Sequence, residues 1–168
     1  MTCVLLASSR SAGNTRALVD LAFPGEDFVL ENLAQLDIAF YSYEDAHDAD
    51  DFLPLVQRML KHETWVIATP LYWYSMSGQA KTFLDRLSGL LSTHRAIGHR
   101  LRGRKLAVLC SGTDPAPPAS FDEPFRLTCR YLGMEFLGSH YERFDGQRPA
   151  EQSARQRAAD FGRTVIES

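Results

Sequence analysis

The sequence has little of what marks several protein classes. Its three cysteines, Cys3, Cys110 and Cys129, are too few and too scattered for a disulfide framework or a cysteine metal site. No apolar run is long enough to span a bilayer, and the first residues lack the basic start of a secretory signal. The formal net charge of −3 gives no strong attraction to nucleic acid or to an anionic membrane. We therefore expect a cytoplasmic protein that binds neither.

The sequence does contain enough apolar residues for a sizeable core. Of its 168 residues, 45% are hydrophobic and 23% charged, and we expect one domain over residues 1–168. Apolar runs predict five strands, over residues 2–7, 28–33, 64–70, 105–111 and 134–141. Helical spacing predicts helices from about residue 14 and over residues 52–60, 77–91, 121–133 and 154–165. Because the strands are apolar almost throughout, the pattern predicts a parallel sheet covered on both faces, a three-layer α/β sandwich.

Three loops that follow predicted strands differ from the other connections. They read SSRSAGNT (8–15), PLYWYSMSG (70–78) and SGTDPAPPAS (111–120), and all are rich in small, hydroxyl or aromatic residues. In an open parallel sheet, ligands bind beyond the carboxyl ends of the strands. We expect the functional site where these three loops meet.

The first loop suits an anion. Gly13 permits a sharp turn, the serines, Asn14 and Thr15 supply polar groups, and the following helix offers unpaired N–H groups. The alternative is an ordinary helix start in which Asn14 caps the helix and the serines are solvated. The loop has neither a Walker sequence nor a Gly-x-Gly-x-x-Gly turn.

The second loop places Tyr72, Trp73 and Tyr74 directly after a buried strand. Exposed aromatic rings at a strand end favour a flat ligand. The alternative is that one or more of them packs on a helix or at a subunit contact. A loop that binds phosphate beside a flat surface of aromatic rings, an aromatic shelf, suits flavin mononucleotide (FMN).

The segments ASSRSAGNT, TPLYWYSMSGQAKTFLDRL and SGTDP…FRLTCRYLGMEFLG resemble the flavodoxin-like NAD(P)H-dependent FMN reductase family, and the likeness runs from Cys3 to about Tyr141. The resemblance implies five parallel strands in the flavodoxin order 2-1-3-4-5. It also implies a set of cofactor-binding residues from the three loops: Ser8, Arg10, Ser11, Gly13, Asn14 and Thr15 for the phosphate; Pro70, Leu71, Tyr72, Trp73, Tyr74 and Ser75 for the ring; and Ser111, Gly112, Thr113 and Asp114 to close the site.

As function, the resemblance implies hydride transfer from NAD(P)H via FMN to a small acceptor: a quinone, a flavin, or an azo or nitro compound. This chemistry needs no catalytic side chain, because the cofactor supplies it. The family's assembly as a homodimer or homotetramer is expected too. A flavodoxin-type electron carrier and a flavin-free binding domain on the same fold remain alternatives.

Two charged tracts each have two possible interpretations. The basic tract 93–105 is either a contact for the 2′-phosphate of NADPH or a solvated loop or subunit contact. The acidic stretch 45–51 is either a metal-binding cluster by composition or a polar connector in which Asp50 or Asp51 caps the next helix. We favour the connector and expect no metal site.

Overall fold

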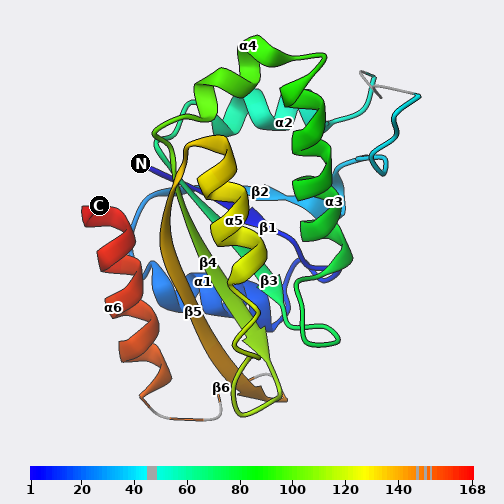
Figure 1. The fold of residues 1–168 in the computed structure, drawn as a ribbon. Coiled ribbons are helices and arrows are strands. Elements are labelled where there is room, and N and C mark those ends of the chain that lie inside the picture. Colours follow the sequence, from blue (N-terminus) through cyan, green and yellow to red (C-terminus); the bar gives the residue numbers. More distant parts are fainter. Residues whose placement is uncertain (45–48, 147, 150, 152) are drawn as a thin grey trace.

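The computed structural model describes residues 1–44, 49–146, 148–149, 151 and 153–168. A twisted sheet lies between two layers of helices (Figure 1). Its strands have the order β2-β1-β3-β4-β5-β6. Their bounds are β1 Thr2–Leu6, β2 Phe28–Asn32, β3 Thr64–Pro70, β4 Lys105–Gly112, β5 Glu135–Asp145 and β6 Arg148–Pro149.

The predicted order 2-1-3-4-5 is confirmed for β1 to β5, which pair in parallel. The prediction of five strands is wrong. β5 continues to Asp145 instead of ending near Tyr141, and β6 pairs with its end in antiparallel orientation through Phe144 and Asp145. A two-residue strand shows no periodicity, so the sequence pattern does not reveal it.

The helices cover both faces of the sheet, as the buried strands predict. α1 (Asn14–Ala22) and α6 (Ala154–Glu167) pack on one face. α2 (Phe52–Met59), α3 (Gly78–Arg86) and α5 (Glu123–Leu132) pack on the other (Figure 1). The predicted helix 77–91 ends its α-helical part at Arg86 and continues as a 3₁₀ turn, and the short α4 spans Arg95–Gly98.

Side chains of one strand alternate between two cores. On β1, Cys3 and Leu5 enter the core under α2, α3 and α5, whereas Val4 and Leu6 enter the core under α1 and α6. All three cysteines are buried and unbonded. Burial raises the pKa of the Cys3 and Cys129 thiols to about 12, and it raises that of Cys110 still further.

Two predicted helix boundaries are confirmed in chemical detail. Gly133 ends α5 in the left-handed conformation at φ 70°, as expected of a glycine C-cap. Asp51 is the N-cap of α2 without a side-chain cap bond, and Asp50, one residue earlier, accepts the N–H of Phe52 on its Oδ1 at 2.9 Å. The other half of the acidic stretch, residues 45–48, lies outside the described residues.

Asp50 also joins α3 to the segment before α2. Its carboxylate pairs with the buried guanidinium of Arg86 and accepts the N–H of Ala39 at 3.0 Å. Arg86 in turn donates to the Ala39 carbonyl at 3.1 Å and lies over the ring of Phe52, 4.8 Å from its centre. The buried positive charge of Arg86 is thus paired with a carboxylate.

Candidate functional site

The ends of β1, β3 and β4 are tied together by three hydrogen bonds. The Ser77 hydroxyl donates to the Ala7 carbonyl at 2.7 Å, which joins the start of α3 to the end of β1. The Leu71 N–H donates to the Ser111 carbonyl at 2.7 Å. The hydroxyls of Thr15 and Ser111 share a buried hydrogen bond of 2.9 Å. The three loops singled out in the sequence therefore begin side by side.

The first loop leaves its backbone donors unpaired. Among the described residues, no acceptor takes the N–H groups of residues 11–16, and the first intrahelical bond is from Ala17 to Gly13 at 3.0 Å. The N–H of Arg10 is held by the Ser8 hydroxyl at 3.4 Å, and Ser8 itself is buried. Such a run of free donors at a helix N-terminus binds anions.

Gly13 has a different role from the one predicted. Its φ of −95° and ψ of −171° are open to any residue, so no sharp turn requires glycine here. The constraint is space, since a Cβ would lie 3.3 Å from the Cβ of Arg10. Arg10 is exposed, as is Ser11, whose hydroxyl accepts the side-chain amide of Asn32 at 2.8 Å.

Asn14 does not cap α1. Gly13 occupies the cap position without a side-chain hydrogen bond, and the Asn14 amide donates instead to the carbonyl of Gly146 at 2.8 Å. Gly146, the residue that follows β5, is therefore hydrogen-bonded to the first loop. Thr15 is buried against Ser111, so its hydroxyl supports the loop from beneath.

The second loop forms a tight hairpin. Tyr72 and Ser75 exchange backbone hydrogen bonds of 2.9 and 3.1 Å, with Trp73 and Tyr74 between them at φ 49° and 66°. Both φ values are left-handed, which is rare for bulky side chains and unfavourable by about 1–2 kcal/mol for each residue. The rings also face solvent, Trp73 at 93% exposure and Tyr74 at 65%.

The other predicted residues of this loop differ in their exposure to solvent. Pro70 is the last residue of β3 and, like Leu71, is buried, so both lie beneath the loop rather than on its surface. Ser75 and Tyr72 are exposed. The predicted aromatic shelf therefore consists of the hairpin alone. Backbone strain and solvent exposure together indicate a surface kept for a partner or ligand.

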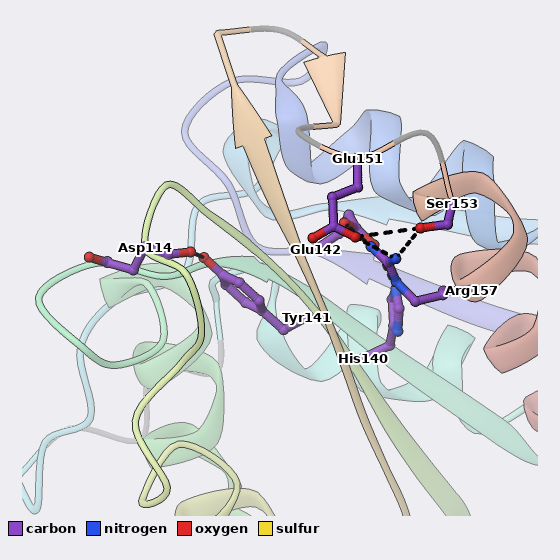
Figure 2. Close-up of polar contacts among 7 residues, drawn as sticks. All are labelled: Asp114, His140, Tyr141, Glu142, Glu151, Ser153 and Arg157. Atoms are coloured by element: carbon purple, nitrogen blue, oxygen red, sulfur yellow. Dashed lines mark hydrogen bonds and ion pairs between the residues drawn. The ribbon is translucent and has the colours of Figure 1, made fainter.

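The third loop is held by a residue outside the predicted set. Gly112 ends β4, and Thr113 and Asp114 are exposed after it. The hydroxyl of Tyr141, from β5, donates to the backbone carbonyl of Asp114 at 2.7 Å (Figure 2). Sequence reasoning missed Tyr141, because the end of a fifth strand gives no signal of contact with a loop 27 residues earlier.

The basic tract 93–105 lies away from this site. It precedes β4 and therefore lies at the amino end of the strand, opposite the three loops (Figure 1). The side chain of Lys105 pairs with Glu63 at 2.8 Å. This position favours the solvated-loop or subunit-contact interpretation over a contact with the 2′-phosphate of NADPH from within the same chain.

Comparison with known proteins identifies the chain's relatives. The profile of the NADPH-dependent FMN reductases matches residues 1–145. A Bacillus subtilis protein, YwqN, described as an NAD(P)H-dependent FMN-containing oxidoreductase, is 28% identical over 160 residues, which cover 88% of this chain and 86% of that protein.

Solved structures agree in fold. The Trp repressor binding protein from Bacillus subtilis has a TM-score of 0.79 at 23% identity, covering 96% of this chain and 97% of that one. An FMN-dependent NADH-azoreductase from Bacillus anthracis, in complex with FMN, has a TM-score of 0.68 at 11% identity over 99% and 97% of the chains. At such identities the likeness establishes the flavodoxin-like fold. The family profile, which spans most of the sequence, establishes more: this chain belongs to the NADPH-dependent FMN reductase family, whose cofactor is FMN and whose electron donor is NAD(P)H.

Proposed function

We propose that this chain, acting as one domain over residues 1–168, is an FMN-dependent oxidoreductase that uses NAD(P)H to reduce a small organic acceptor of the quinone, flavin, azo or nitro class. One observation carries the proposal. Unpaired backbone donors and a strained, exposed aromatic hairpin occur at strand ends that hydrogen bonds hold together. The chain matches the FMN reductase profile, is 28% identical to a protein described as FMN-containing, and shares the fold of an azoreductase solved with FMN.

The donors present suit the phosphate of FMN. The free N–H groups of residues 11–16 lie at the start of α1, where the helix dipole also favours negative charge. Arg10 adds an exposed cation, and Ser9 and Ser11 add exposed hydroxyls. We propose that this loop binds the phosphate, with Ser8, Thr15 and Ser111 supporting it from below.

Bound FMN supplies the hydride chemistry, and the residues of the chain bind, orient and cover it. We propose that Trp73 and Tyr74 form the shelf against which flat rings lie, since both side chains are exposed beyond the end of β3. The N–H groups of Thr113 and Asp114 have no acceptor among the described residues and are donors for the ring's polar edge.

Assembly into a homodimer or homotetramer is part of the proposal. Apolar side chains are exposed on α5 and on the turn after α3, with Leu91 at 42%, Leu127 at 45% and Tyr131 at 77% exposure. Together with Leu84 and Leu87 they line one groove between these elements. Light scattering on the purified protein measures the assembly directly.

The proposal is tested by anaerobic spectroscopy. FMN is added to purified protein while its fluorescence is followed, and NADPH or NADH is then added under nitrogen. We expect saturable quenching of FMN fluorescence, bleaching of the flavin band by a nicotinamide donor, and recovery of the band on adding a quinone, an azo dye or a nitroaromatic compound. Bleaching without reoxidation by any acceptor class would contradict the proposed reaction, and absence of quenching would contradict the site.

A further inference from the structure

We infer that Tyr141 is a positioning residue that holds the third loop of the site in its FMN-binding conformation, an inference that rests on the proposed function. The residue lies on β5, outside the predicted binding set, and its phenol reaches across to the loop that follows β4. Its hydroxyl donates to the backbone carbonyl of Asp114 at 2.7 Å (Figure 2).

The geometry around Gly112 depends on the same ring. A Cβ built on Gly112 would lie 2.6 Å from the Tyr141 hydroxyl oxygen and 3.0 Å from a ring carbon. Residue 112 therefore has to be glycine for the phenol to pass and reach Asp114. The absence of a side chain at one predicted site residue is explained by the tyrosine, and the two positions are coupled.

The loop has few other means of holding its shape. Pro115, Pro117 and Pro118 follow Asp114 and have no N–H groups with which to form a hydrogen-bonded turn. A carbonyl acceptor and an external donor are what such a segment can use. With the Asp114 carbonyl fixed, the neighbouring N–H groups of Thr113 and Asp114 keep a defined position.

The strand that carries Tyr141 is itself anchored on its other face. Glu142, which is 2% exposed, accepts a hydrogen bond from Arg157 of α6 at 2.7 Å (Figure 2). Arg157 also pairs with Glu151 at 2.9 Å. The strand that carries the phenol is thereby fixed against α6. Burial raises the pKa of Tyr141 to about 12, so its hydroxyl keeps the donating proton at ordinary assay pH.

The experiment compares Tyr141→Phe with wild type and with the control Tyr43→Phe, which removes a hydroxyl from an exposed tyrosine in the segment before α2. We expect Tyr141→Phe to raise the Kd for FMN, measured by fluorescence quenching, about five- to tenfold, the loss of one hydrogen bond. Its bound flavin should show a shifted absorption band and midpoint potential, while the apoprotein should melt only slightly below wild type, because the hydrogen bond that it loses is exposed. The control should match wild type in every reading.

A second comparison tests the coupling. Gly112→Ala should weaken FMN binding more in the wild-type background than in Tyr141→Phe, because the tightest contact of the added methyl group is with the hydroxyl. Equal penalties in both backgrounds, an unchanged Kd in Tyr141→Phe, or a Kd change that merely follows lower apoprotein stability would overturn the inference and leave the proposed function intact. Failure of wild type to bind FMN would overturn both.

Discussion

The two ends of the sheet differ in whether their hydrogen-bond donors are paired within the chain. At the amino end the donors are paired within the chain: Lys105 contacts Glu63 at 2.8 Å, Arg104 donates to the His62 carbonyl at 3.1 Å, and the Trp65 indole donates to the Met59 carbonyl at 2.8 Å. At the carboxyl end the N–H groups of residues 11–16, with those of Thr113 and Asp114, have no acceptor among the described residues.

The difference separates stability from binding. A donor satisfied within the chain contributes to folding, whereas a donor left open is available to a ligand and adds little until one binds. Exposed cations are therefore poor markers of the site. The most basic tract of the sequence lies at the amino end, whereas the phosphate loop at the carboxyl end consists mainly of backbone N–H groups, with Arg10 as its exposed cation.

The largest expected effect concerns the buried ion pair of Asp50 and Arg86, which joins α3 to the segment before α2. Asp50→Asn removes the negative charge of a carboxylate that pairs with the buried Arg86 and should lower the free energy of unfolding by about 3 kcal/mol, while FMN affinity is retained. Urea denaturation measures this, with Arg126→Gln, from an exposed pair with Glu123, as control. A loss of FMN affinity in folded Asp50→Asn would contradict the conclusion that contacts for stability and contacts for binding are separate.

The same residue predicts a pH dependence. Burial works to raise the pKa of Asp50, but hydrogen bonds from Arg86 and from the N–H groups of Phe52 and Ala39 outweigh it and hold the pKa below its ordinary 3.8. The contribution of the carboxylate is therefore complete above that value and is lost as pH falls through the lowered one. Wild type should lose more stability on acidification below about pH 4 than Asp50→Asn does.

The next effect concerns the open donors directly. Ala12→Asp puts a negative charge among the free N–H groups and should weaken FMN binding by about 2 kcal/mol, roughly thirtyfold. The apoprotein should not lose stability, because a carboxylate near a helix N-terminus is favourable. Ala96→Asp, on α4, is the matched control and should bind FMN normally. Equal affinity in the two variants would place the phosphate elsewhere.

A smaller effect should appear at the hairpin. Trp73→Gly removes the strain of a left-handed bulky residue and should stabilise the apoprotein by about 1 kcal/mol, whereas Trp73→Ala keeps most of that strain. Both should change the ranking of kcat/KM among acceptors while FMN is retained. Thermal melting and steady-state assays check the two parts. Flavin loss with an unaltered ranking would count against the shelf.

The smallest effect is expected at the satisfied end. Lys105 hydrogen-bonds Glu63 and lowers the pKa of that exposed carboxylate below 4.5, so its contribution is present above 4.5 and disappears as pH falls through the lowered value. Glu63→Gln should lower the melting temperature slightly at neutral pH, less at acidic pH, and leave FMN binding unchanged. An altered Kd for FMN would show that the two ends communicate.

Most of the fold was predictable because buried strands leave a strong pattern. The run from Thr64 to Pro70 is mostly apolar and buried throughout, and its predicted bounds are those observed. The extension of β5 and the pairing of β6 were not, since they depend on a two-residue strand and on contacts between distant segments. Helix α1 was predicted near its start, but the choice of Gly146 as the partner of Asn14 needs the tertiary structure.

The site was predictable as a set of loops and less so in its detail. Parallel topology alone brings the ends of β1, β3 and β4 together. The left-handed backbone at Trp73 and Tyr74 could not be predicted from the sequence, because turns of this kind usually contain glycine or asparagine. Tyr141 was missed for a related reason: only a structure shows which side chain fills the space left by Gly112.

The burial of all three sulfhydryl groups has a practical consequence. Peroxide oxidises a cysteine through its thiolate and has to reach the sulfur. Here burial keeps the thiols protonated and out of contact with solvent. Reduced flavins generate peroxide when they meet oxygen, so a catalyst of this kind works beside its own oxidant. With all three thiols buried, the folded protein should not be inactivated in air by oxidation of its cysteines.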